Sequence, residues 1–375
     1  MEEYHPGLDG VIATETEVSY LDLEAESIVI RGYDLIELAE RVSYLDVGYL
    51  LWHRELPTPQ QHRQLATELI EAQSVPEAIV QIFRHLGPAV HLMDALRTGI
   101  SALAASDPDV ARAENVDRDR QLLSLWAKMP TLVAQSYRIK ANLPLLAERV
   151  DLDYAANFLW QITGREPTAL ASEIFDKLLT LYSEHEMPNS TFCARVIAST
   201  LADPYAAMTG AVASLKGPLH GGANEEVMHM LEKVGRPEAM AAYLKARLQA
   251  KDRIMGFGHR VYMHRPDPRA VMMKTLLARL VEEKGGSDLL AMCQIGEDVM
   301  RQEKGLFANL DYYAAPVYHL LGIPTELFTP IFFAARTAGL CAHIREQYAN
   351  NRLYRPRVRY LGPRGLRMES GSGSI

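Results

Sequence analysis

The segment Ser214-Leu-Lys-Gly-Pro-Leu-His220-Gly-Gly-Ala-Asn places a histidine among glycines, and Met255-Gly-Phe-Gly-His259-Arg-Val-Tyr repeats that combination further along the chain. A glycine inside a helix costs roughly 1 kcal/mol relative to alanine, so these glycines do not serve helix stability. Glycine instead lets the backbone adopt a positive φ or approach a ligand closely. Together with Asn309-Leu-Asp311-Tyr-Tyr, the two segments predict one cleft in which two imidazoles and a carboxylate meet.

The composition sets limits on the class of protein. A chain of 375 residues, 48% of them apolar, allows one large domain or two unequal ones. No run approaches the roughly 20 apolar residues that a membrane helix needs, and the acidic N-terminus lacks the apolar segment of a secretory signal. Three widely spaced cysteines fit neither a disulfide framework nor a zinc site, so we expect a reduced, cytoplasmic protein.

The charge is uneven along the chain. A net charge of −8 argues against nonspecific nucleic-acid binding. Nevertheless, residues 251–274 hold six Lys or Arg against two Asp, and residues 352–367 hold six Arg and no acid. Two basic segments in an acidic protein fit an anionic small molecule, and they fit equally well a solvated basic face or tail.

Hydrophobic periodicity predicts a mainly α protein with a short N-terminal β segment. Residues 7–33 read as β structure, because residues 18–23 and 27–32 are short β-rich runs around an acidic turn. We find no internal repeat and no βαβ alternation. Helices are expected from Asp34 onward, with Pro76, Pro88, Pro108 and Asn115 as interruptions, over residues 58–73, 117–142, 151–164, 168–183, 190–200, 203–215, 224–235, 237–251, 267–284, 288–304, 311–321 and 325–348.

Two local features carry their own expectations. Pro130 should kink or break the helix over residues 117–142, because proline removes a helical hydrogen bond. The Arg/Pro/Gly-rich C-terminal segment should form an extended arm. Residues 369–375 read as a flexible tail or an expression scar.

Several motifs, taken in order, resemble one known family, citrate synthase. They are Gly217-Pro-Leu-His220-Gly-Gly-Ala-Asn, Gly256-Phe-Gly-His259-Arg-Val-Tyr, Asp267-Pro-Arg269-Ala, Asn309-Leu-Asp311-Tyr, Phe328-Thr-Pro-Ile, Ala335-Arg336-Thr-Ala-Gly and Asn350-Asn-Arg-Leu-Tyr-Arg355-Pro-Arg. The resemblance covers nearly the whole chain, at the length of the shorter bacterial and archaeal form. Ala308 stands where many members have proline, and Leu310 where valine is frequent; both exchanges are apolar.

The resemblance implies a helical homodimer whose subunits each close a small domain over a large one. We expect residues 1–219 to form the first part of the large domain. Residues 220–324 would form the small domain on the acyl-CoA side, and residues 325–375 the rest of the large domain with the C-terminal arm. A cleft between two such domains is a common ligand site.

The resemblance also assigns the catalytic roles. Citrate synthesis joins the methyl carbon of acetyl-CoA to the ketone carbon of oxaloacetate, which requires a base and a donor to the thioester oxygen. Asp311 is implied as the base, His220 as the donor to the thioester oxygen, and His259 as the donor to the ketone oxygen. From the residues alone, Asp311 could equally cap the helix that follows it, and each histidine could be a structural loop residue.

Substrate contacts follow from the same resemblance. Arginine forks suit the two carboxylates of oxaloacetate. The implied oxaloacetate ligands are His185, Asn189, Arg269, Arg336 and Arg355, the last from the other subunit. The implied CoA contacts are Ile254, Met255, Gly256, Phe257, Gly258 and Lys304. Arg336 and Arg355 could instead be ordinary surface arginines.

No cofactor is expected, since acetyl-CoA counts as a substrate. Nothing in the sequence requires a metal. His185-Glu186 does not complete a His-Glu-x-x-His zinc motif, because position 189 is Asn. Gly-Phe-Gly-His lacks the third glycine of a dinucleotide fingerprint.

Three functions remain in competition. The first is a citrate synthase of the tricarboxylic acid cycle. The second is a 2-methylcitrate synthase using propionyl-CoA, because one methylene is worth only about 1–3 kcal/mol in a pocket. The third is a noncatalytic helical assembly or CoA-binding protein that kept the fold. Intact His220, His259 and Asp311 argue against the third.

Overall fold

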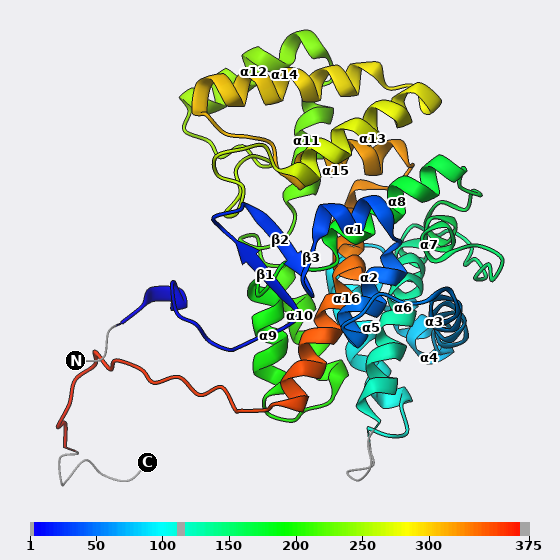
Figure 1. Cartoon of the computed structure of the whole chain (residues 1–375), viewed down its shortest axis with the longest axis vertical. Helices are drawn as coiled ribbons and strands as arrows, with labels where there is room; N and C mark the ends of the chain where they lie inside the picture. Colours follow the sequence, from blue (N-terminus) through cyan, green and yellow to red (C-terminus); the bar gives the residue numbers. More distant parts are fainter. Residues whose placement is uncertain (1–3, 111–116, 368–375) are drawn as a thin grey trace.

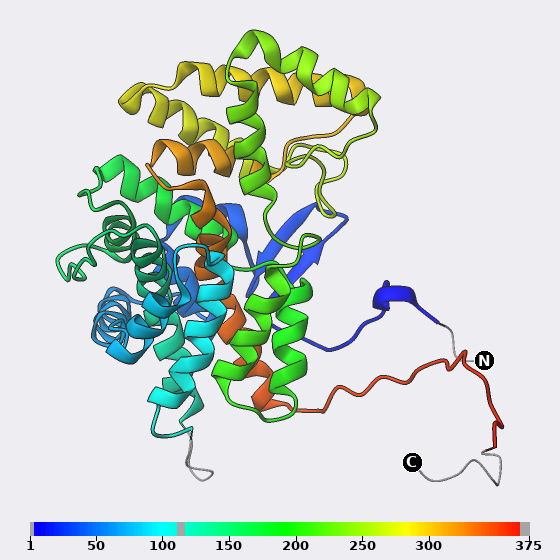
Figure 2. The same ribbon diagram turned by 180° about the vertical axis from the view of Figure 1, so that it is seen from behind.

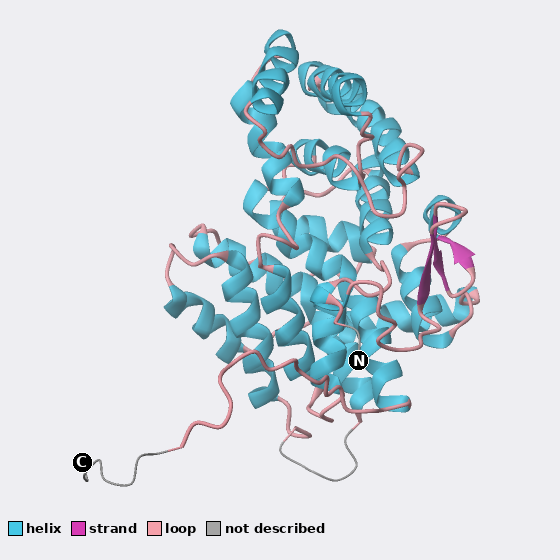
Figure 3. Cartoon of the chain, turned by 90° about the vertical axis from the view of Figure 1, so that its left-hand side faces the viewer, coloured by secondary structure: helices cyan, strands magenta, loops and turns pink. Residues whose placement is uncertain are grey.

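The computed structural model describes residues 4–110 and 117–367, and it is mainly helical with one small sheet, as predicted (Figure 3). The strands are β1 (Ser19–Asp22), β2 (Ser27–Ile30) and β3 (Tyr33–Asp34). The α-helices are α1 (Leu35–Arg41), α2 (Tyr44–His53), α3 (Pro59–Ala72), α4 (Glu77–Leu86), α5 (Leu92–Ser106), α6 (Arg118–Lys140), α7 (Tyr154–Thr163), α8 (Ala169–Tyr182), α9 (Asn189–Ala198), α10 (Pro204–Leu215), α11 (Ala223–Val234), α12 (Pro237–Gln249), α13 (Pro268–Lys284), α14 (Ser287–Lys304), α15 (Leu310–Leu320) and α16 (Phe328–Ala349). Short 3₁₀ turns are η1 (Pro6–Leu8) and η2 (Thr325–Leu327).

The N-terminal β segment is antiparallel, in the order β1-β2-β3. Ile28 and Ile30 point into the core while their neighbours are partly exposed, which is the period-2 pattern of a half-buried strand. The β prediction is wrong for residues 7–18. There the backbone follows η1 and an irregular path, and its polar groups bond to helices: the Glu17 N–H donates to Glu346 Oε1 at 2.9 Å instead of joining a ladder.

The helix boundaries follow the capping signals. Asp34 accepts hydrogen bonds from the first-turn amides of α1, and Thr58 with Gln61 forms a capping box at α3. Pro130 does not break α6, which runs through it as one helix, while the alternative of a kink stays a prediction. Pro130 is buried, and packing of α6 against neighbouring helices offsets the missing hydrogen bond. Asn115 lies outside the described residues.

The helices form two groups that meet at α15 (Figures 1 and 2). The buried helix α16 is the centre of the larger group and contacts α2, α5, α6, α8, α9 and α10. In the upper group of Figure 1, α12 packs on α14, while α15 packs on α11 and α13. The helix α13 also contacts α8 of the larger group. Of the predicted site residues, Asp311 lies at the start of α15 and Arg269 at the start of α13.

One helix, Thr325–Ala349, is long and apolar enough to cross a membrane, contrary to the expectation from the sequence. However, 94% of its apolar window is buried inside the molecule. It is therefore a core helix of this fold. Beyond it, residues 350–367 form the predicted extended arm, which leaves the body together with the N-terminal segment (Figure 1).

Candidate active site

Two distant loops are joined beside α15. The Gly258 N–H donates to the Phe307 carbonyl and the Asn309 N–H donates to the Gly256 carbonyl, each at 2.9 Å. Gly256 has φ +88°, and a Cβ there would lie 2.8 Å from Val227 Cγ2. The positive φ and close approach predicted from the sequence are therefore real at this glycine. The pairing brings the loop that ends in His259 against the start of α15.

Asp311 is the second residue of α15, and its carboxylate does not cap the helix. Asn309 is the N-cap and accepts from the Asp311 N–H at 3.1 Å, so the capping interpretation of Asp311 is wrong. The Tyr182 hydroxyl donates to Asp311 Oδ1 at 2.6 Å. Burial raises the pKa of Asp311, and this hydrogen bond and the Arg269 charge oppose the rise.

His259 faces hydrogen-bond donors with both ring nitrogens. The Val261 N–H donates to Nδ1 at 3.1 Å, which leaves the proton of a neutral ring on Nε2. Nε2 lies 2.9 Å from Arg269 Nη2 and 3.1 Å from His185 Nε2. Burial first, and then Arg269, lowers the pKa of His259 to about 4, so the ring is neutral at pH 7. Because Arg269 is also a donor, an oxygen placed between the two groups could accept from both.

Two buried arginines face the same place. Arg269 is 5% exposed and its guanidinium pairs with Asp267, which also accepts from the Leu310 N–H at 3.2 Å. Arg336 is 4% exposed and donates from Nε to the Tyr182 carbonyl at 2.6 Å. Burial lowers the pKa of Arg336 to about 10, against the raising effect of Glu184. A buried site with this much positive charge suits a ligand with more than one carboxylate.

His220 is held by the start of α9. The Ser190 backbone N–H donates to His220 Nε2 at 3.1 Å, and Ser190 Oγ lies 2.9 Å from the same atom. A backbone N–H can only donate, so Nε2 is the acceptor and Nδ1 carries the proton. Burial first, and then Arg336, lowers the pKa of His220 to about 4. His220 is thus a neutral imidazole whose Nδ1–H is its donor.

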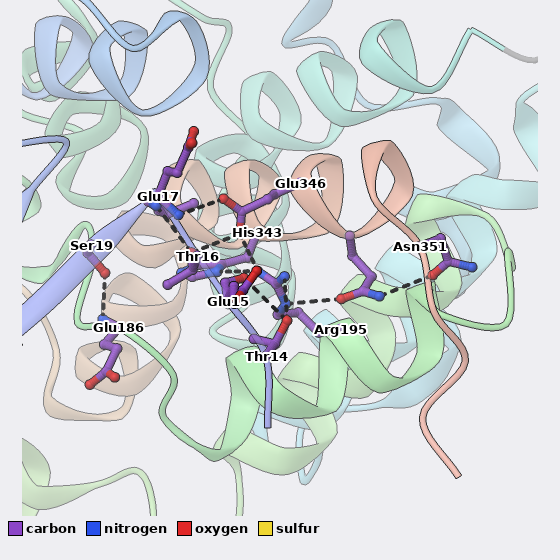
Figure 4. Close-up of polar contacts among 12 residues, drawn as sticks. Thr14, Glu15, Thr16, Glu17, Ser19, Glu186, Arg195, His343, Glu346 and Asn351 are labelled. Atoms are coloured by element: carbon purple, nitrogen blue, oxygen red, sulfur yellow. Dashed lines mark hydrogen bonds and ion pairs between the residues drawn. The ribbon is translucent and has the colours of Figure 1, made fainter. Parts of the chain in front are cut away.

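The segment that carries His185 rests on a buried polar network. Glu184 accepts from Ser19 Oγ at 2.8 Å and pairs with His343 at 3.0 Å. Behind it, Arg195 contacts His343 and Glu346. Figure 4 shows how these groups tie residues 14–19 to α9 and α16. The network fixes residues 184–186, and burial together with the nearby arginines lowers the pKa of His185 well below its usual value.

Other predicted residues lie apart from this cluster. Asn189 is exposed and accepts from Ser214 Oγ at 2.6 Å, and Lys304 is exposed at the end of α14. Arg355 lies on the exposed arm, where it lines a cavity of about 970 Å³ with residues 13–17 and the end of α16. None of His220, His259 and Asp311 lines that cavity. Ile254 and Met255 line a smaller cavity of about 190 Å³. Three cationic side chains line it as well: Lys233 of α11, Arg247 of α12 and Arg253 of the loop after α12.

The sequence interpretation gave no role to four residues that hold the cluster together: Tyr182, Ser190, Asp267 and Asn309. Asp267 and Asn309 stand at helix-start positions within quoted motifs, so capping signals could have found them. Tyr182 and Ser190 act through contacts with residues far along the chain, and no local pattern marks them. Among the described residues, no group of three His, Cys, Asp or Glu side chains is arranged to hold a metal ion.

Comparisons with known proteins agree with this geometry. The family described as citrate synthase, C-terminal domain, matches residues 7–357. The chain is 52% identical to a citrate synthase of Heyndrickxia coagulans, covering 98% of each chain. It is 54% identical to a citrate/2-methylcitrate synthase of Bacillus subtilis, covering 97% of this chain and 98% of the other.

A solved structure is similar in fold over nearly its whole length. It is the ternary complex of carboxymethyl coenzyme A and oxaloacetate with citrate synthase from Thermoplasma acidophilum. The two structures superpose with a TM-score of 0.90 at 29% identity, covering 98% of each chain. The motifs, the fold and these relatives agree, and the chain is a member of the citrate synthase family of transferases.

Proposed function

We propose that this protein condenses acetyl-CoA with oxaloacetate and water to give citrate and CoA. The proposal is carried by the way that two chains of contacts join the predicted residues. The first runs from Asp311 through Tyr182 to Arg336. The second runs from His185 through His259 to Arg269. A base, buried arginines and neutral imidazole donors are the parts that this condensation needs.

In the first step, the Asp311 carboxylate takes a proton from the acetyl methyl group. The negative charge that develops on the thioester oxygen accepts a hydrogen bond from His220 Nδ1–H. A neutral donor is suited to this task, since its proton stays on the ring while the enol-like nucleophile forms. The Ser190 contacts support this role because they hold the tautomer that leaves Nδ1–H free.

In the second step, the enol carbon attacks the ketone carbon of oxaloacetate and forms the new carbon–carbon bond. His259 Nε2–H and Arg269 donate to the ketone oxygen as it becomes an alkoxide, and Arg269 and Arg336 bind the carboxylates. Water then hydrolyses the citryl-CoA thioester, releasing CoA and citrate. A substrate oxygen between His259 and Arg269 would relieve the donor–donor contact described above.

The remaining assignments belong to this proposal. Residues 1–219 and 325–375 form the large domain and residues 220–324 the small one. Two copies form a homodimer in the cytoplasm, in which Arg355 of each completes the oxaloacetate site of the other. The arginine-rich arm supports this, because most residues from 350 to 367 are exposed to solvent. His185 and Asn189 add oxaloacetate contacts, while residues 254–258 and Lys304 contact CoA.

A second candidate substrate is propionyl-CoA, giving 2-methylcitrate. The relative that is 54% identical carries both activities in its name. The same base and donors serve either thioester, and the pocket for the extra methyl group decides the preference.

Release of free CoA thiol tests both candidates. It is measured with oxaloacetate and either acetyl-CoA or propionyl-CoA, and the product is identified by mass. We expect release that requires oxaloacetate and a higher specificity constant for acetyl-CoA. A higher constant for propionyl-CoA would favour the methylcitrate reaction, and no release with either would favour the noncatalytic alternative.

A further inference from the structure

We propose that Tyr182 is a positioning residue that aims the carboxylate of Asp311 at the acyl methyl group and ties it to the arginine that binds oxaloacetate. The inference rests on the proposed function. It begins from the 2.6 Å hydrogen bond that the Tyr182 hydroxyl donates to Asp311 Oδ1. That distance is typical of an O–H donor on an ionised oxygen.

Tyr182 is itself fixed from three sides. It is 2% exposed at the C-terminal end of α8. Its ring packs edge-on against Phe332, with centroids 4.8 Å apart, and Phe332 in turn lies 4.8 Å beneath the Arg336 guanidinium. Its carbonyl accepts from Arg336 Nε at 2.6 Å. One residue therefore contacts the candidate base through its side chain and the candidate substrate arginine through its backbone.

The hydrogen bond leaves one carboxylate oxygen for chemistry. Among the described residues, the donor to the Asp311 side chain is Tyr182, on Oδ1, and none donates to Oδ2. With Oδ1 held, rotation about the Cβ–Cγ bond is restricted and Oδ2 keeps one direction. Misplacement of a reacting group by about 1 Å can cost about a hundredfold in rate. The hydroxyl is thus placed to convert a freely rotating carboxylate into an oriented base.

Several charged and polar groups surround Asp311, and they determine its titration. Arg269 and Asp267 face it from the start of α13, Arg336 from α16 and Tyr182 from α8. Burial raises the pKa of Tyr318, on the same helix, and the charge of Asp311 adds to the rise, but the Tyr318 hydroxyl donates no hydrogen bond to the carboxylate. Burial raises the pKa of the Tyr182 phenol far above its usual value, and Asp311 adds to the rise, so the phenol remains a donor across the working pH range. Its hydrogen bond favours the ionised form of Asp311.

Tyr182→Phe removes the hydroxyl while keeping the ring and the carbonyl that holds Arg336. We expect kcat to fall about ten- to hundredfold because the base loses its orientation. The KM for oxaloacetate should stay within about twofold, because the arginines keep their places. The acidic limb of kcat/KM for acetyl-CoA should move up by about one pH unit, because Asp311 loses a donor to its charged form.

Tyr318→Phe is the matched control. Tyr318 is also a buried tyrosine beside Asp311, but its hydroxyl has no hydrogen-bond partner among the described residues. Its removal should leave kcat and the pH profile unchanged. Identical behaviour of the two variants, with no shift of the acidic limb in Tyr182→Phe, would overturn the positioning role. No thiol release by the wild-type enzyme would instead overturn the proposed function.

Replacement of Tyr182 by 3-fluorotyrosine keeps the test decisive if the phenylalanine variant does not fold. This substitution preserves the shape and makes the phenol a stronger donor. The acidic limb should then move to lower pH, the direction opposite to that expected for Tyr182→Phe. An unmoved limb would contradict the proposal.

Discussion

The Ser190 backbone N–H donates to Nε2 of His220 at 3.1 Å, and this contact determines which nitrogen of His220 can act on a substrate. Since Nε2 is occupied as an acceptor, Nδ1–H is the donor. The donor is a backbone N–H, which a substitution such as Ser190→Ala keeps, so the tautomer is tested best by changing His220 itself.

His220→Asn and His220→Gln separate the two nitrogens. An Asn amide nitrogen can take the place of Nδ1, whereas a Gln amide nitrogen reaches toward Nε2 and meets the donors of Ser190. We expect both kcat values to fall, with the Asn variant retaining about tenfold more activity, since one misplaced donor costs about that much or more. Steady-state kinetics with acetyl-CoA measures this. A Gln variant more active than the Asn variant would contradict the assigned tautomer.

The histidines of the cluster should make the protein less stable in mild acid. Burial is the chief cause that lowers the pKa values of His220 and His259 to about 4, and it also lowers that of His185 well below its ordinary value. The unfolded chain binds protons below about pH 6.5, whereas the native chain does not, so the free energy of unfolding falls as pH drops from about 7 toward about 5. Asp176, whose pKa is raised to about 7 by burial, acts in the opposite direction.

His259→Gln isolates one of these groups. Over that pH range, its free energy of unfolding should depend on pH more weakly than that of the wild type, by up to about one proton. Denaturant unfolding at a series of pH values measures the slopes. Parallel slopes would mean that native His259 takes up its proton at an ordinary pH.

Gly256 should be intolerant of a side chain. Its φ is +88°, and a Cβ would lie 2.8 Å from Val227 and 2.9 Å from Tyr312. Gly256→Ala should therefore cost about 1–3 kcal/mol in stability and raise the KM for acetyl-CoA, because the loop before His259 must shift. Gly235→Ala is the control: φ is +71°, but the nearest atom lies 3.6 Å away. It should cost about 1 kcal/mol and leave the kinetics unchanged.

The dimer proposal predicts complementation between inactive chains. Arg355→Gln removes the arginine given to the neighbouring site, and Asp311→Asn removes the base of a subunit's own site. A hybrid dimer of the two variants has one intact site. After unfolding and refolding together in equal amounts, activity should rise to about a quarter of the wild-type value. Failure to rise, with hybrids confirmed by mass, would place Arg355 in its own subunit's site or outside both.

The sequence predicted what depends on local patterns. Glycines beside His220 and His259 mark the two loops that carry these histidines, because glycine is unfavourable in a helix. Capping residues such as Asp34 and Thr58 marked helix starts to within a residue or two. The family motifs supplied the roles, which spacing alone could not separate from capping or loop packing.

The rest depends on contacts between distant residues. A tyrosine near the end of an apolar helix reads as core, and only the fold reveals that Tyr182 reaches Asp311. Thr16 and Glu17 read as strand, but both bond to Glu346 far along the chain. Pro130 reads as a break, yet buried packing keeps α6 continuous. In each case tertiary structure outweighed a local preference.

The most direct test of the account is the turnover of Asp311→Asn measured beside its binding of oxaloacetate. The substitution keeps the shape of the side chain and removes the base. We predict that kcat for CoA release falls by about 10²–10⁴-fold while the dissociation constant for oxaloacetate, measured by calorimetry, changes little. Near-normal turnover in that variant would contradict the central claim that Asp311 takes the methyl proton.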